Sequence, residues 1–62
     1  MVTTYVTAEV SRDGKWWLVY VKEINKYTQA CSLAEAEMMA RDLTALWLHV
    51  PPESVEVTVN VA

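Results

Sequence analysis

The chain has 62 residues, a formal net charge of −3, one cysteine and 53% hydrophobic residues. A chain of this length forms one domain (residues 1–62) and buries only roughly 60% of its unfolded surface, so its core is marginal. One cysteine excludes an intrachain disulfide, and the acidic balance disfavours general binding to nucleic-acid phosphates while it suits a basic protein partner. We therefore expect self-association to supply stability that the monomer lacks.

The N-terminus lacks the basic segment and the apolar run of a secretory leader. No apolar run approaches the ~20 residues that a transmembrane helix needs. Because the single thiol is also unpaired, we expect a cytoplasmic protein that does not contact membranes.

The first third of the chain predicts a β-hairpin. Residues 2–10 alternate between apolar and polar side chains, and residues 16–22 follow as a second strand. Asp13-Gly14 between them is a strong hairpin signal, because a type I′ turn needs positive φ at both central residues. With these two residues as the loop, the expected pairs are Val10 with Trp17, Ala8 with Val19, and Val6 with Val21. All six side chains then share one face of the sheet, which is the predicted core side.

The opposite face of this hairpin is too aromatic for a purely solvated surface. It carries Tyr5, Trp16, Leu18 and Tyr20. A contiguous patch of this kind marks a contact site, and we predict one here. The same rings suit a platform for stacking the bases of single-stranded nucleic acid. Only Lys15 and Lys22 are basic nearby, so a protein contact is the favoured interpretation.

A helix is predicted to begin after Ser32, which follows a short strand over residues 27–31. Ser32 and Glu35 fit the capping box, in which each side chain accepts a hydrogen bond from an otherwise unpaired backbone N–H. The helix is expected to reach residue 48 or 49, because Pro51-Pro52 cannot continue it.

Apolar residues occupy more than one side of this predicted helix. The stripe expected against the sheet consists of Ala36, Met39, Ala40, Leu43, Leu46, Trp47 and Val50. A second side carries Met38, Arg41, Ala45 and Leu48. Because a helix that is apolar on two sides has a second packing surface, these four residues form the second candidate interface.

Residues 54–61 alternate again and predict the last strand. The order β-β-β-α-β defines a small α+β domain with one helix packed on a mainly antiparallel sheet. This order is similar to part of the ribonuclease H fold.

No group of side chains predicts catalysis or a bound cofactor. His49 is expected in the last helical turn, where a cation complements the helix dipole, and Cys31 as a buried, inert thiol. The first and last strands offer only Glu9 and Glu56 as metal-binding carboxylates. We therefore expect no enzymatic activity, no metal and no cofactor.

A series of short motifs runs along the chain in a recognisable order. They are Asp13-Gly14, Trp16-Trp17, Glu23-Ile24, Thr28-Gln29, Ser32 and Glu35-Ala36. The helical segment 36–43 and the tail 50–55 continue the pattern. In this order the chain resembles the N-terminal domain of HicB-family antitoxins, over essentially its full length. It departs from the family at Lys22, where proline is frequent, and at Lys26 and Ala30, which replace loop glycines.

The resemblance implies a HicB-like partial ribonuclease H fold, a homodimer or larger assembly, and a partner. That partner is a HicA-type toxin, a small basic ribonuclease that degrades mRNA and that family antitoxins inhibit by covering its catalytic histidine. Typical members continue into a DNA-binding domain, whereas this sequence stops before one, so we expect no direct DNA binding. The predicted function is neutralisation of such a toxin. The alternative is an oligomeric scaffold or adaptor, bacterial or phage, that kept the fold without the toxin.

Overall fold

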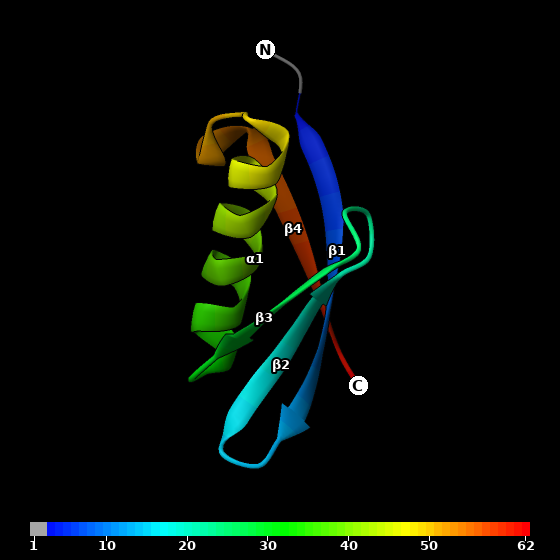
Figure 1. Ribbon diagram of the computed structural model, residues 1–62, viewed down its shortest axis with the longest axis vertical. Helices are drawn as coiled ribbons and strands as arrows, with labels where there is room; N and C mark the ends of the chain where they lie inside the picture. The colour runs from blue at the N-terminus through cyan, green and yellow to red at the C-terminus, as the bar shows by residue number, and fades with distance from the viewer. Residues whose placement is uncertain (1–2) are drawn as a thin grey trace.

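The computed structural model describes residues 3–62 as one helix packed against one face of a β-sheet (Figure 1). Its elements are β1 (Thr4–Asp13), β2 (Trp16–Val21), β3 (Lys26–Ala30), α1 (Leu33–Leu48), the short 3-10 helix η1 (Pro52–Ser54) and β4 (Val55–Val61). The predicted β-β-β-α-β order is confirmed, with η1 inserted before the last strand. Val2, predicted to open the first strand, lies outside the described residues.

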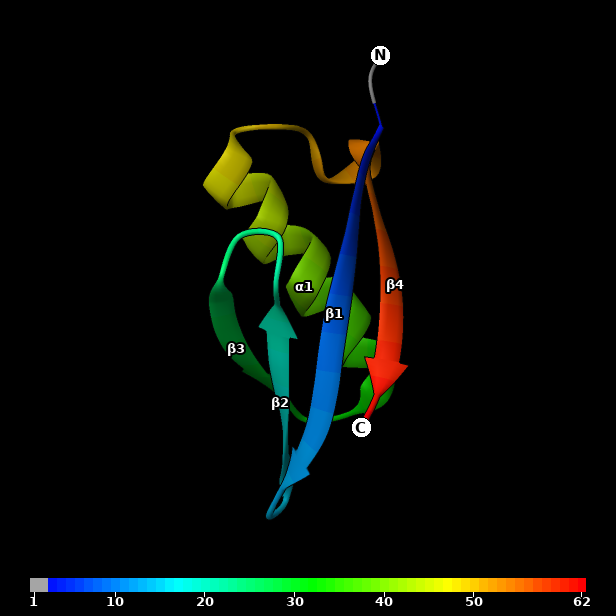
Figure 2. The same ribbon diagram turned by 90° about the vertical axis from the view of Figure 1, so that its right-hand side faces the viewer.

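The four strands form one mixed sheet in the order β3-β2-β1-β4. β2 pairs antiparallel with both β1 and β3. β4 runs parallel to β1, because α1 carries the chain back to the end of the sheet where β1 begins (Figure 2). The sheet is therefore mainly antiparallel, as predicted, and its one parallel pair places β4 on the edge farthest from β3.

The first hairpin turns one residue later than the sequence predicts. The loop consists of Gly14 and Lys15, not of Asp13 and Gly14. Only Gly14 of these two has a positive φ, at 63°, as in hairpin loops with glycine at the first central position. Val10 accordingly lies opposite Val19 rather than opposite a tryptophan. Because the register differs from the prediction by two residues, every side chain keeps its predicted face.

Both ends of α1 are closed by local hydrogen bonds. The Ser32 hydroxyl accepts a hydrogen bond from the Glu35 backbone N–H at 3.1 Å. The Glu35 carboxylate accepts one from the backbone N–H of Cys31 at 3.2 Å, one residue before the position of an ideal capping box. At the other end, His49 adopts the left-handed conformation (φ 58°, ψ 46°), a place usually taken by glycine or asparagine. The helix therefore ends at Leu48, three residues before Pro51.

The core between the helix and the sheet consists of small side chains. The buried hydrophobic residues are Val6, Ala8, Val10, Val19, Val21, Ala30, Ala36, Ala40, Ala45 and Val55. Within residues 3–62, no fully buried side chain is larger than valine. The alanines let the helix approach the sheet closely, and the resulting interior is thin, as expected for a chain of this length.

The C-terminal part of α1 overturns part of the predicted core. In Figure 2 the helix crosses the sheet diagonally, from the end of β4 toward the beginning of β3. Leu46 and Trp47, which the sequence places in the core, are 75% and 52% exposed. Helical periodicity determines which side of the helix a residue occupies, but the extent of the sheet beneath it decides whether that side is covered.

Ala45 is buried, with 4% of its surface exposed, so the prediction that it lines an exposed interface is wrong. The segment after the helix folds back over this side. The backbone N–H of Val50 donates to the Ala45 carbonyl at 3.0 Å, and η1 contacts α1. Thr44 beside it is also fully buried, and its hydroxyl has no hydrogen-bond partner.

Candidate protein-interaction surfaces

The outer face of the sheet, on the side away from α1, is defined by the strand register. One row across all four strands contains Tyr27, Tyr20, Glu9 and Asn60. The next row contains Gln29, Leu18 and Ser11. Because residues paired across strands project to the same side, these seven side chains form one continuous surface, the outer patch.

Two tyrosines lie side by side in the outer patch. The ring centroids of Tyr20 and Tyr27 are 4.5 Å apart, and their planes are tilted by 31°. The Tyr20 hydroxyl donates to Asn25 Oδ1 at 2.9 Å, from the turn between β2 and β3. Asn25 adopts φ 53°, a conformation that asparagine tolerates better than most residues. The turn thus holds the Tyr20 ring, while Tyr27 remains 62% exposed.

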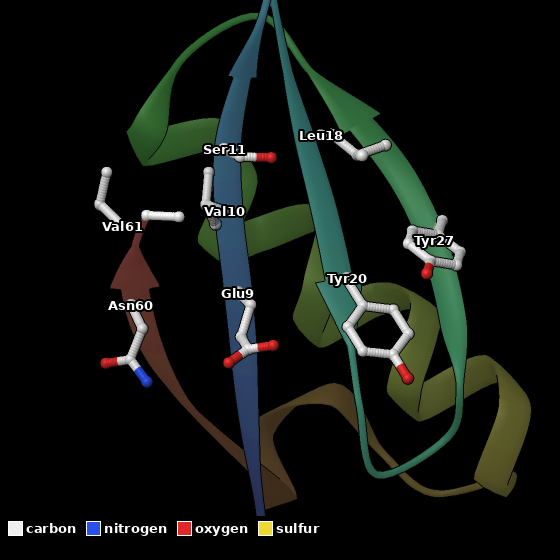
Figure 3. A pocket seen from close by; sticks show the side chains of 9 residues that line it. Glu9, Val10, Ser11, Leu18, Tyr20, Tyr27, Asn60 and Val61 are labelled. Atoms are coloured by element: carbon white, nitrogen blue, oxygen red, sulfur yellow. The ribbon is translucent and has the colours of Figure 1, made fainter.

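A hollow of about 360 Å³ opens beside these rings (Figure 3). Figure 3 shows the Glu9 side chain between Tyr20 on one side and Asn60 on the other. Leu18 and Val61 add apolar walls. The hollow therefore offers a carboxylate, an aromatic ring and an amide to one side chain of a binding partner.

The charges at the strand positions of the outer face have one sign, and Lys15 and Lys22 lie in the turns that border it. Its strand positions carry Glu9, Asp13 and Glu56, and no lysine or arginine occupies such a position in the part of the chain that the structure describes. Glu23, in the turn after β2, adds a carboxylate that accepts a hydrogen bond from the Thr7 backbone N–H at 2.9 Å. An aromatic surface lined by carboxylates attracts cationic groups.

The structure divides the predicted aromatic patch into separate parts. Leu18 and Tyr20 belong to the outer patch. Tyr5 lies beyond the end of β2 and is 75% exposed, whereas Trp16 lies at the hairpin, paired with Asp13. The segment of β1 from Tyr5 to Asp13 spans roughly 26 Å at about 3.3 Å per residue. Tyr5 therefore lies apart from the other three predicted residues, whereas Trp16, two residues from Leu18 on the same face of β2, continues the patch toward the hairpin.

Tyr27 is the aromatic residue of the outer patch that sequence reasoning misses. Its place follows from the pairing of β2 with β3, which sets it opposite Tyr20. The alternation in β3 groups Tyr27 with Gln29, but the face they share depends on the preceding turn. The available signal is Ala30, whose small apolar side chain favours the core and so directs Tyr27 outward.

The second candidate interface does not form one exposed surface. Met38 and Leu48 are 50% and 42% exposed, but Ala45 between them is buried. Arg41 is directed toward β4, where its Nε donates to the Val55 carbonyl at 3.2 Å. Arg41 therefore ties the helix to the beginning of β4, and the four predicted residues do not act together.

The other exposed hydrophobic surface is an apolar overhang at the C-terminal end of α1. This overhang consists of the exposed Leu46 and Trp47 and of the half-buried Leu43, which also packs against the core; together with His49 they line a hollow of about 430 Å³. The Lys26 ammonium on β3 lies 4.2 Å from the centroid of the Trp47 ring, in a cation–π contact. This contact joins the overhang to the edge of the sheet.

Reactive and metal-binding groups do not gather at either surface. Cys31 is exposed, so the prediction of a buried thiol is wrong: the residue lies in a bend between β3 and the helix cap. No group of three or more histidine, cysteine, aspartate or glutamate side chains in residues 3–62 is placed to hold a metal ion. Over those same described residues, the structure contains no helix with the length and apolar character needed to span a membrane.

No protein-family model, no curated protein and no solved structure matches this chain. The features of this chain that bear on its function are therefore the outer patch, the apolar overhang and the order of the sequence motifs.

Proposed function

We propose that this chain is a HicB-like antitoxin domain that binds and neutralises a small, basic, HicA-like toxin that degrades mRNA. The observation that carries the proposal is the outer patch, in which a pair of tyrosine rings lies beside carboxylates and no lysine or arginine occupies an outer-face strand position of the described residues. The sequence motifs supply the identity of the partner. The sheet order β3-β2-β1-β4 supports the partial ribonuclease H fold that this resemblance implies.

The chemistry of the outer patch fits a basic protein surface. An arginine or lysine side chain of the toxin stacks on Tyr20 and pairs with the neighbouring Glu9 carboxylate in the hollow that both residues line. The net charge of −3 steers a positively charged partner toward the domain before contact. Because the Tyr20 ring is already held by Asn25, little conformational entropy is lost when the partner binds.

The test measures binding to a HicA-like toxin encoded beside the gene for this chain, with the toxin's catalytic histidine replaced so that both proteins can be produced. Reversing Glu9 and Glu56 to lysine should lower the association rate at low salt at least about tenfold, because the outer face no longer attracts the toxin. The matched control reverses Asp42 and Glu53, which are exposed on α1 and η1. It makes the same change in net charge and should alter the rate less than about twofold.

Three results would contradict the proposal. A wild-type domain that does not bind the toxin favours the scaffold or adaptor function instead. Equal losses in the two charge-reversed variants would mean that overall charge, not the outer patch, governs binding. Quenching of tryptophan fluorescence by an oligonucleotide at low salt would favour single-stranded nucleic acid as the ligand.

A further inference from the structure

β3 and β4 are the two edges of the sheet, and the hairpin loop determines which backbone groups of β3 are unpaired. Residues that flank a two-residue loop exchange both backbone hydrogen bonds, so the residues next to Gly14 and Lys15 bond to each other. Successive residues of β2 direct their backbone hydrogen bonds alternately toward β1 and toward β3. Counted from Trp16, which bonds to β1, Val19 bonds toward β3. On β3, the backbone N–H and C=O groups of Tyr27 and Gln29 consequently point away from the sheet.

This free edge is complementary to itself about Thr28. A two-fold axis midway between the Thr28 residues of two copies pairs Tyr27 of one copy with Gln29 of the other. This pairing satisfies every outward N–H and C=O group of the two residues. Lys26 then lies opposite Ala30 of the other copy, so no like charges meet. The register of β3 thus permits a symmetric antiparallel pairing without a mismatched residue.

The apolar overhang covers the helix side of this edge. Arg41 points toward β4, and at 3.6 residues per turn Leu43 and Leu46 lie on the other side of the helix, the side of β3. Figure 2 shows the C-terminal end of α1 reaching the beginning of β3. A strand added beside β3 would therefore lie under Leu43 and Leu46, with Trp47 held over Lys26 at its border.

The β4 edge has a different flank. There the helix presents Arg41 and Glu37, whose charged groups lie 3.9 Å apart. Burial of this pair against a second strand carries a desolvation cost that the apolar overhang does not have. Glu56 adds a further charge on β4 itself. Of the two edges, β3 is the one that combines unpaired backbone groups with an apolar cover.

We infer that the β3 edge and the apolar overhang form the contact between two copies of this chain, which joins two four-stranded sheets into one. A stable homodimer buries roughly 800 Å² of each partner, about a fifth of the 4091 Å² that this chain exposes. Tyr27, Leu46 and Trp47, all more than half exposed, lie at this site. The contact uses the backbone of Tyr27 and leaves the Glu9 side of the outer patch open, so it does not depend on the proposed function.

Light scattering after size exclusion tests the contact with two matched variants. Leu46→Glu places a charge in the overhang, and Met38→Glu places one at another exposed position of the same helix, two turns earlier and about 80° around the helix axis from Leu46. The wild type should be a dimer. Leu46→Glu should weaken it at least about 100-fold, because the substitution acts twice across the two-fold axis. Met38→Glu should remain a dimer.

Amide hydrogen exchange locates the contact and checks the fold at the same time. The amides of Tyr27 and Gln29 should be protected in the wild-type dimer and exchange rapidly in Leu46→Glu. The amide of Thr28 bonds to β2 and should stay protected in both proteins, which shows that the variant remains folded.

A wild-type monomer at about 100 μM would overturn the inference. A dimer that Leu46→Glu leaves intact would do the same, as would one that Met38→Glu disrupts equally. Protection of the Val57 and Val59 amides in place of those on β3 would assign the contact to the β4 edge instead.

Discussion

The covered face and the outer face of the sheet differ in the size of their side chains. Under α1, the fully buried residues are no larger than valine. On the outer face, Trp16 and Tyr27 are 43% and 62% exposed, although each aromatic side chain can remove roughly 150–250 Å² from water when buried. A monomer optimised for its own stability would have the reverse distribution. Much of the apolar surface of this chain is therefore available for contacts outside the monomer.

The position of the helix accounts for the difference in side-chain size between the two faces. Ala36 and Ala40 bring α1 so close to the sheet that valine fills the space between them. Larger side chains such as Trp17, Ile24 and Met39 then pack only at the margin of this interior, partly buried, and others lie in the outer patch and the apolar overhang. Substitutions that make the same chemical change on both faces test this comparison directly.

The largest expected effect is the difference in stability between two variants that each place a charge on β2, one at a residue of the covered face and one at its neighbour on the outer face. Val19→Asp puts a carboxylate without a partner into the closed core, which costs several kcal/mol. A 62-residue domain has a total stability of roughly 3–9 kcal/mol, so circular dichroism at 25 °C should show an unfolded chain. Leu18→Asp puts the same group on the outer face and should change the free energy of unfolding by less than about 1 kcal/mol. A folded Val19→Asp variant would contradict the assignment of the covered face.

A smaller effect, of opposite sign, is expected from the buried hydroxyl of Thr44. Thr44→Val removes a polar group that has no hydrogen-bond partner and keeps the shape of the side chain, so it should stabilise the domain by about 1 kcal/mol. The midpoint of thermal unfolding should rise by roughly 4–8 °C. Thr58→Val, at an exposed outer-face position, is the control and should leave the midpoint within about 2 °C. Equal shifts in the two variants would mean that the core hydroxyl is satisfied.

The smallest effect concerns the contact that joins the overhang to β3. Lys26→Gln removes the cation over the Trp47 ring and should lower the free energy of unfolding by about 0.5 kcal/mol. Lys22→Gln, an exposed change in the turn after β2, should have no measurable effect. Chemical denaturation at one ionic strength compares the two variants. A loss of the same size in both would indicate a general charge effect rather than a contact with Trp47.

Sequence patterns predicted the elements and the faces of the hairpin because those depend on neighbouring residues. Alternation in β1 and β2 sorts side chains onto two faces whatever the exact loop, so Val10 and Val19 are in the core despite the shifted register. Ser32 likewise caps the helix through a hydrogen bond to a residue three positions along the chain. The outer patch was predicted only in part, at Leu18 and Tyr20.

The element order, the helix boundaries and the alternation of each strand follow from the amino-acid sequence, because they arise from local backbone preferences and side-chain periodicity. Which sides of the helix are covered depends instead on contacts between distant segments. Ala45 is buried because the return segment folds over it, and Leu46 is exposed because it lies on the side of the helix away from β4, where the helix reaches the sheet edge at β3. Tyr27 meets Tyr20 for the same reason: strand pairing brings together residues whose relation depends on the turn between them. Such contacts between distant segments leave no periodic trace in the chain, and they define both candidate surfaces of this protein.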